Sequence, residues 1–170
     1  QSDVSRPGSL SYNAVWSIYE DRQGTLWVGT LGGLNRFDRD TGRFRTYMPD
    51  TSDPFSLSFH KVWPIYEDRE GALWVGTLGG GLNKFDRETE RFLRYRFDPA
   101  DSYSLSHDVV SSIYETRDGT LWIGTDGGGL NLFDRKTGIF SKLVHDPLDS
   151  ASLSETTVIT RGLFVEVRFC

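Results

Sequence analysis

The stretch GALWVGTLGGGLNKFD, residues 71–86, has the glycine density of a loop whose backbone could wrap a phosphate group. A Walker-type phosphate loop places Lys and then Ser or Thr directly after its second glycine. Gly76 and Gly81 have the spacing of that motif, but Leu82 stands where Lys is needed. No helix pattern follows that would point its N-terminus at an anion. Turns with positive φ and close backbone approaches therefore explain these glycines better than phosphate binding does.

Pairs of aspartates three residues apart are the next candidates, because carboxylates that converge in one loop can bind calcium. The pairs are Asp50 with Asp53, Asp98 with Asp101, and Asp146 with Asp149. A proline lies between or beside the members of each pair, and two carboxylates are few for calcium. Asx turns explain this spacing more simply, so we expect neither a metal site nor a cofactor.

The nucleophiles and bases give no sign of a catalytic centre. The three histidines, His60, His107 and His145, have no His-x-x-His or Cys–His arrangement. The tripeptide Ser-Leu-Ser occurs four times, whereas a catalytic serine would be single. The carboxylate pair Glu67–Asp68 also recurs, as Glu20–Asp21 and, with one change, as Glu115–Thr116. Groups that recur in this way indicate a structural role, and we expect the chain not to be an enzyme.

The composition excludes two classes of partner and favours many tight turns. The chain has 170 residues, a net charge of −5, 18 glycines and 14% aromatic residues. Nucleic acid is not an expected partner, because no basic surface pattern is present. No apolar run approaches the ~20 residues that a membrane span requires. The single cysteine, Cys170, can form no internal disulfide and does not fix the compartment.

These features all belong to an internal repeat with a period of 47 to 48 residues. Ser-Leu-Ser begins at Ser9, Ser56, Ser104 and Ser152, and the motif LW[VI]GT contains Trp27, Trp74 and Trp122. The chain is therefore three full copies and the start of a fourth. In the second copy the sequence predicts strands at 61–68, 72–77, 82–86 and 91–97, with tight turns between them.

Four short antiparallel strands in each ~40–50 residues, with a recurring Gly/Trp motif, are typical of a β-propeller blade. We expect one all-β domain, a β-propeller of three four-stranded antiparallel blades at about 9–49, 56–97 and 104–145. A four-stranded sheet cannot bury both of its apolar faces alone, so the blades must stack on one another. We expect Trp27, Trp74 and Trp122 to fill the gaps between blades.

The repeat, SLS…V..I.ED..G.LW[VI]GT.GGGLN.FD..TG.F..Y, resembles the two-component regulator propeller repeat, over about residues 9–158. Such repeats are found in the sensor ectodomains of bacterial hybrid histidine kinases. The resemblance implies a periplasmic or exported sensing module, and the ligands of this family are often glycans. The family usually has more repeats, a linker domain, a membrane helix and a kinase, none of which this sequence contains. A signalling role is therefore implied by analogy.

The fourth repeat departs from the pattern after Val158. Its glutamate and aspartate are missing, and apolar residues alternate with others from Leu163 to Phe169. This alternation predicts one C-terminal closing strand over about 157–169, without a hairpin. The edge of such a strand needs a partner, either in the same chain or in another one.

Three blades leave two open faces, because propellers have about four to eight blades. We expect two chains to form a homodimer that closes one six-bladed ring by two-fold symmetry. The alternative is that the chain is a fragment whose ring is completed by further sequence.

Positions that differ among the copies are free to serve a binding site. Those at the start of the first strand and after the Gly-Thr motif should ring the mouth of the central channel. They are Tyr12, Asn13, Trp16, Phe59, His60, Lys61, Trp63, His107, Asp108 and Asp126.

Tryptophan beside Asn, His and Lys is suited to a carbohydrate or peptide ligand, so we predict a ligand- or protein-binding module. The competing interpretation is that these residues only pack or solvate the channel. A structural or assembly unit without a ligand, and a propeller lyase or hydrolase, remain the alternative functions.

Overall fold

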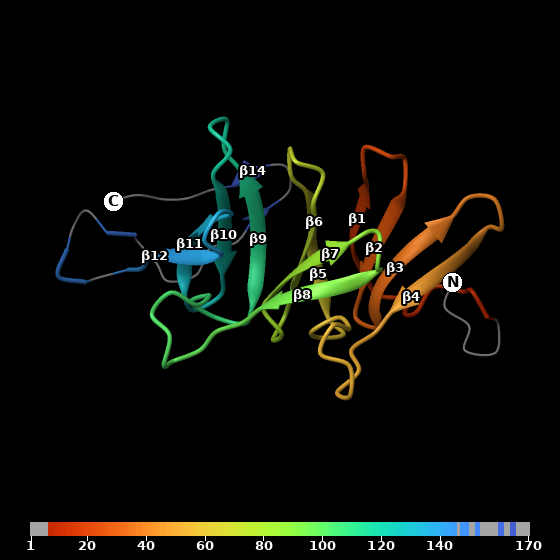
Figure 1. Ribbon diagram of the computed structural model, residues 1–170, viewed down its shortest axis with the longest axis horizontal. Coiled ribbons are helices and arrows are strands. Elements are labelled where there is room, and N and C mark those ends of the chain that lie inside the picture. The colour runs from red at the N-terminus through yellow and green to blue at the C-terminus, as the bar shows by residue number, and fades with distance from the viewer. Residues whose placement is uncertain (1–6, 146, 150–151, 154–159, 162–163, 166–170) are drawn as a thin grey trace.

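The computed structural model describes residues 7–145, 147–149, 152–153, 160–161 and 164–165 (Figure 1). This part of the chain contains three four-stranded antiparallel sheets, each with its strands in chain order. We call them blades 1, 2 and 3. Blade 1 consists of β1 (Val15–Glu20), β2 (Leu26–Thr30), β3 (Gly33–Asp38) and β4 (Arg43–Tyr47).

Blades 2 and 3 repeat this arrangement. Blade 2 consists of β5 (Val62–Glu67), β6 (Leu73–Thr77), β7 (Leu82–Asp86) and β8 (Arg91–Tyr95). Blade 3 consists of β9 (Val110–Glu115), β10 (Leu121–Thr125), β11 (Gly129–Asp134) and β12 (Ile139–Leu143). The all-β fold and its three four-stranded blades confirm the sequence prediction. None of the described residues forms a helix long and apolar enough to cross a membrane.

The C-terminal segment differs from the prediction where it is described. Within the predicted strand at 157–169, β13 (Thr160–Arg161) pairs with β14 (Phe164–Val165) in antiparallel fashion. The described residues therefore belong to two paired strands rather than one, because alternation predicts an extended backbone but not how many strands it forms. The other residues of this range lie outside the described part.

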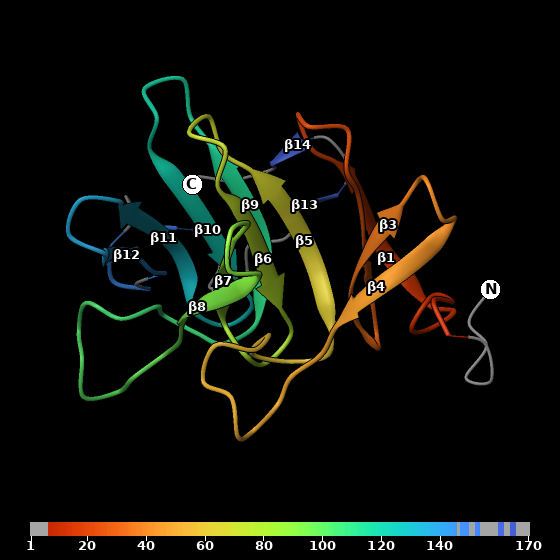
Figure 2. The same cartoon turned by 45° about the vertical axis from the view of Figure 1, so that its right-hand side comes forward.

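The three blades lie side by side in chain order in both views of the ribbon (Figures 1 and 2). The first strand of each blade contacts the first strand of the next, β1 with β5 and β5 with β9. The first strand of each blade is therefore the innermost strand of the three-blade array. The loops that join a fourth strand to the next first strand lie at the lower edge in Figure 1, and the turns between first and second strands lie at the upper edge.

The contact between two adjacent blades, which we call a seam, contains one tryptophan. Trp27 meets Phe85 of blade 2 edge to face, with 5.1 Å between ring centroids, and Trp74 meets Phe133 of blade 3 at 5.3 Å. Both indoles are almost completely buried, at 1% and 0% exposed. Trp122, the third copy, is only partly buried and packs against Leu130 and Leu153.

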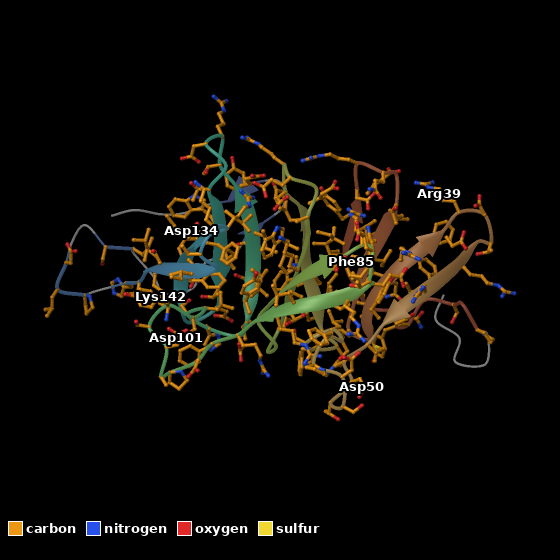
Figure 3. All side chains as sticks on the ribbon, in the orientation of Figure 1. Arg39, Asp50, Phe85, Asp101, Asp134 and Lys142 are labelled. Carbon is orange, nitrogen blue, oxygen red and sulfur yellow. The ribbon has the colours of Figure 1, made fainter. Side chains whose placement is uncertain are left out.

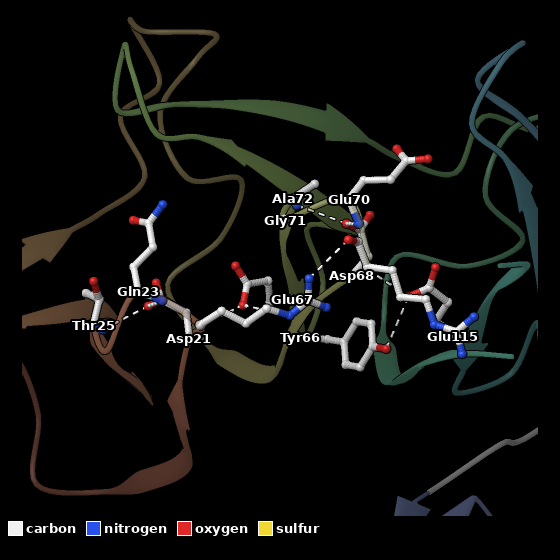
Figure 4. A network of polar contacts seen from close by, with 12 residues as sticks. Asp21, Gln23, Thr25, Tyr66, Glu67, Asp68, Glu70, Gly71, Ala72 and Glu115 are labelled. Carbon is white, nitrogen blue, oxygen red and sulfur yellow. Dashed lines mark hydrogen bonds and ion pairs between the residues drawn. The ribbon is translucent and has the colours of Figure 1, made fainter. Parts of the chain in front are cut away.

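Charged side chains join the same blades at the upper edge of each seam (Figure 4). At the first seam, Asp21 Oδ2 accepts a hydrogen bond from Trp27 Nε1 at 2.8 Å and pairs with Arg87 Nη1 at 2.7 Å. Arg87 Nη2 also pairs with Glu67 Oε1 at 3.0 Å, and Glu67 Oε2 accepts the backbone N–H of Arg22 at 2.8 Å. One arginine thus links the carboxylate of its own blade to that of the preceding blade.

The second seam repeats these contacts almost atom for atom. Asp68 Oδ2 accepts Trp74 Nε1 at 2.8 Å and pairs with Arg135 at 3.2 Å. Arg135 also pairs with Glu115 Oε1 at 2.9 Å, and Glu115 Oε2 accepts the backbone N–H of Arg69 at 2.8 Å. The recurring glutamate–aspartate pairs are therefore seam residues.

The glycine-rich stretch from residue 71 to 86 forms the hairpin of β6 and β7. A Cβ on Gly76 would come within 2.6 Å of Val110 on the innermost strand of blade 3, so only glycine allows this approach of the two blades. Gly81 has a φ of +78° at the turn into β7. Both glycines serve the blade and its seam, as the repeat pattern predicts.

Replacing the tryptophan of a complete seam should lower stability far more than replacing Trp122, the partly buried copy. We expect Trp74→Ala to lower the free energy of unfolding by about 3–5 kcal/mol, because a cavity forms and Asp68 loses a donor. Trp122→Ala should cost less than half of this, since that indole is partly exposed. Urea unfolding followed by circular dichroism measures both values, and equal losses would contradict the assigned seam roles.

The first seam should also make stability depend on pH. Burial raises the pKa of Asp21, but hydrogen bonds from Trp27, Arg87 and Thr25 outweigh it and hold the pKa below its ordinary value. Such a carboxylate stabilises the fold above its unfolded pKa of about 3.9, and this stabilisation is lost as the pH falls through the lower folded pKa. The free energy of unfolding should therefore fall below about pH 4. In Asp21→Asn it should fall less steeply, and identical slopes would rule the effect out.

Candidate functional site

The residues that vary among the copies gather at the lower edge of the blades in Figure 1. In each copy a backbone hydrogen bond ties the turn after the second strand to the segment before the first strand. These bonds run from Leu31 N to Ala14 O (3.2 Å), from Leu78 N to Lys61 O (3.0 Å) and from Asp126 N to Val109 O (2.9 Å). The two variable segments of each blade are thus held next to each other.

Trp16 and Trp63 form a pair across the first seam. Their rings meet edge to face, with 5.7 Å between centroids and 65° between planes. The register of both first strands shifts here, between Val15 and Ser17 in β1 and between Val62 and Ile65 in β5. A β-bulge redirects the side chain at the irregularity, which explains how tryptophan on an inner strand can remain 41% exposed at Trp16.

An open depression of about 640 Å³ lies at the same end of blade 1. It brings together three predicted residues from two copies of the repeat, Tyr12, His60 and Lys61, and adds Met48 from the segment after β4. The other lining residues are Ser11, Leu31, Gly32 and Thr46. Tyr12 and Met48 are about half exposed, at 50% and 49%. This surface combines apolar side chains with an imidazole and an ammonium group.

Met48 was not among the predicted site residues. Its position directly follows the fourth strand, and the equivalent positions in the other copies hold Arg96 and Val144. This variation was the available signal, but the prediction considered only positions near the first strand and the Gly-Thr motif.

Asp108 links blades 2 and 3 through hydrogen bonds of its side chain and its backbone. Its Oδ1 accepts the backbone N–H of Phe97 at 2.8 Å, and its Oδ2 lies 3.4 Å from Arg96 Nη2. Its backbone carbonyl accepts N–H groups from Gly79 at 3.0 Å and Gly81 at 2.9 Å. The carboxylate therefore holds the end of β8 against the start of blade 3.

The remaining predicted residues belong to the same edge. The Phe59 ring lies over His60, with 4.4 Å between centroids. His107 Nδ1 accepts the backbone N–H of Val109 at 3.2 Å, and Asp126 is an exposed residue of the neighbouring turn. Asn13 is exposed beside Tyr12.

The aspartate pairs form turns. Asp50 and Asp53 accept the backbone N–H groups of Ser52 (2.8 Å) and Phe55 (2.9 Å), and Asp98 and Asp101 accept those of Ala100 and Tyr103 (both 2.9 Å). These are the predicted Asx turns. Of the third pair, Asp146 lies outside the described residues. Among the described residues, no three His, Cys, Asp or Glu side chains gather as metal ligands would.

Comparison with known proteins agrees with this architecture. The sequence profile of the two component regulator propeller matches residues 9–32, 56–79 and 104–127. The solved extracellular domain of the putative hybrid two component system BT3049 from B. thetaiotaomicron superposes with a TM-score of 0.80 at 30% identity. That match covers 94% of this chain and 22% of the other, so this chain spans about a fifth of that domain.

Two further structures are similar over most of the chain. The extracellular domain of the putative one component system BT4673 from the same organism has a TM-score of 0.65 and 26% identity, over 79% of this chain and 19% of that one. Virginiamycin B lyase from Staphylococcus aureus has a TM-score of 0.57 and 15% identity, over 82% and 43%, and so shares the fold alone. A search of curated proteins finds no significant match.

Substitutions at this edge should separate bracing residues from exposed ones. Asp108→Ala should lower the free energy of unfolding by about 1–2 kcal/mol, because it leaves the backbone N–H of Phe97 without its acceptor. His60→Ala should change stability by less than about 0.5 kcal/mol, since its ring is partly exposed. Parallel urea titrations test this difference. An Asp108→Ala variant with the same free energy of unfolding as the wild-type protein would show that Asp108 does not stabilise the seam.

Proposed function

Because this chain carries three two-component regulator propeller repeats, we propose that it is a non-catalytic recognition module of a sensor domain outside the cytoplasm. The similar solved structures include extracellular domains of a putative hybrid two component system and a putative one component system from one bacterium, which supports a periplasmic or extracellular site of action. Since this chain spans only about a fifth of such a domain, any signalling output belongs to a larger assembly.

One observation carries the recognition part of the proposal. The repeat keeps its seam tryptophan and glutamate in every blade but varies at one edge, and that edge carries the Trp16–Trp63 pair and the depression beside Tyr12. Exposed aromatic faces pack on the apolar faces of sugars or on apolar peptide side chains. His60 and Lys61 supply nearby hydrogen-bond donors that would fix orientation. The module would thus take a carbohydrate or peptide ligand.

The proposal also includes assembly as a homodimer that closes one six-bladed ring. Its support is the pair of uncovered blade faces at the two ends of the three-blade array. An enzymatic function has no comparable support, since the likeness to the lyase is one of fold alone.

Removing both indoles of the Trp16–Trp63 pair should abolish the recognition surface without unfolding the protein. We expect that a panel of oligosaccharides and short peptides, screened by thermal shift, contains a ligand for the wild-type protein. Trp16→Ala combined with Trp63→Ala should weaken binding of that ligand by about tenfold or more in calorimetric titration.

The matched control is Tyr103→Ala, which removes an exposed aromatic ring from the connecting loop between blades 2 and 3. It should leave the affinity unchanged. If the folded wild-type protein binds nothing in the panel, or if the double variant binds as well as wild type, this edge is not a recognition surface. The first of these results would favour a purely structural unit.

A further inference from the structure

Blade 1 exposes a row of apolar side chains that the other blades bury. Val15 is 39% exposed, whereas its equivalents Val62 and Val110 are 0% exposed. Ile18 is 67% exposed, whereas Ile65 is 8% exposed. We call this surface the first open face; its apolar members are Val15, Ile18, Leu26, Phe37 and Phe44. In blades 2 and 3 the preceding blade covers the equivalent residues.

Blade 3 exposes the opposite side of the seam. Leu143 is 42% exposed, whereas Tyr47 at the same position of blade 1 is 8% exposed. Tyr114, on the innermost strand, is 47% exposed. We call the surface of Tyr114, Leu143 and the partly buried Trp122, on which Leu153 packs, the second open face. At the two internal seams, the following blade covers the equivalent side chains.

We propose that the second open face of one chain docks on the first open face of a second copy, and that the same contact forms twice around a two-fold axis. This inference rests on the homodimer of the proposed function and assigns its surfaces. Each copy carries one face of each kind, so two copies satisfy all four. Residues Thr160 and Arg161 stand where blade 2 has Pro64 and Ile65, so the fourth repeat departs from the blade pattern at these positions.

The polar groups on the two open faces correspond to those that join the blades at the internal seams. At those seams the glutamate of the following blade accepts a backbone N–H from the preceding blade. Glu20 holds this position on the first open face, is 56% exposed, and pairs with Arg39 at 2.7 Å. Arg39 projects from the side of blade 1 that faces away from blade 2 (Figure 3). Arg117 of blade 3 is the equivalent donor residue for Glu20 of the second copy.

One of these polar groups, the aspartate carboxylate, is missing from the second open face. Thr116 stands where the preceding blades have Asp21 and Asp68. Trp122 Nε1 is consequently buried without a hydrogen-bond partner among the described residues. The docked Arg39 would meet a hydroxyl where Arg87 and its equivalent in blade 3 meet a carboxylate. The seam between copies therefore lacks one ion pair, and we expect the dimer to dissociate more readily than the blades of one chain separate.

Restoring the missing carboxylate tests both the faces and the partner. Thr116→Asp should lower the dissociation constant of the homodimer by about tenfold in sedimentation equilibrium. Adding Arg39→Ala should remove this gain, whereas Arg39→Ala alone should change the dimer little. Thr51→Asp adds the same charge in an exposed loop and should have no effect. If Thr116→Asp impairs folding, Glu20→Ala replaces it and should weaken the dimer by about fivefold.

The outcomes separate this assignment from the rest of the proposed function. A wild-type protein and a folded Thr116→Asp variant that both remain monomeric up to high concentration would overturn docking of a second copy. Other blades of a longer protein would then cover the open faces. A dimer whose dissociation constant responds to none of these substitutions would overturn the face assignment alone. Ligand binding at Trp16 and Trp63 is measured separately, so neither result decides the recognition proposal.

Discussion

The packing of one tryptophan per blade against a phenylalanine of the next blade is the contact on which the rest of the structure depends. A four-stranded sheet has two apolar faces, and its own strands bury neither, so each blade is stable only against a neighbour. Trp27 and Trp74 fill the two complete seams, and a buried aspartate at each seam accepts the indole N–H. The same aspartate pairs with an arginine of the following blade. Apolar packing and charge pairing thus converge on one carboxylate.

Repetition within one chain provides an internal reference for every position. Val15, Val62 and Val110 have the same residue type and the same place in a strand, yet only Val15 is exposed. The difference in exposure is caused by the presence or absence of a neighbouring blade and not by the residue type. The tryptophan, glutamate and arginine that recur in all three blades serve the seams, whereas the segments before each first strand, which vary among the copies, lie at the lower edge in Figure 1. The seam fixes the geometry, and the edge is free to acquire recognition chemistry.

The period of the sequence predicted the strands closely, because alternation and turn residues determine them locally. β7 has the predicted bounds, and β5 and β8 end within two residues of theirs. Contacts that arise only on packing were not predictable. Glu90 takes a φ of +55° where the other copies have glycine, and it pairs with Arg36 and Arg45 of blade 1. Likewise the register shifts at Trp16 and Trp63 recur at Ser111 in blade 3, so they do not depend on tryptophan.

The candidate site crosses the first seam, and this position has a physical consequence. Its aromatic pair joins β1 to β5, and its depression joins blade 1 to residues that lead into blade 2. The backbone bond from Gly33 N to His60 O, 2.7 Å long, fixes the two sides of the depression together. The aromatic pair and the depression are therefore built from blades 1 and 2. Closure of a ring would add further blades, but the aromatic pair and the depression are already formed within one chain. The proposed recognition surface and the proposed contact between copies thus lie at different seams.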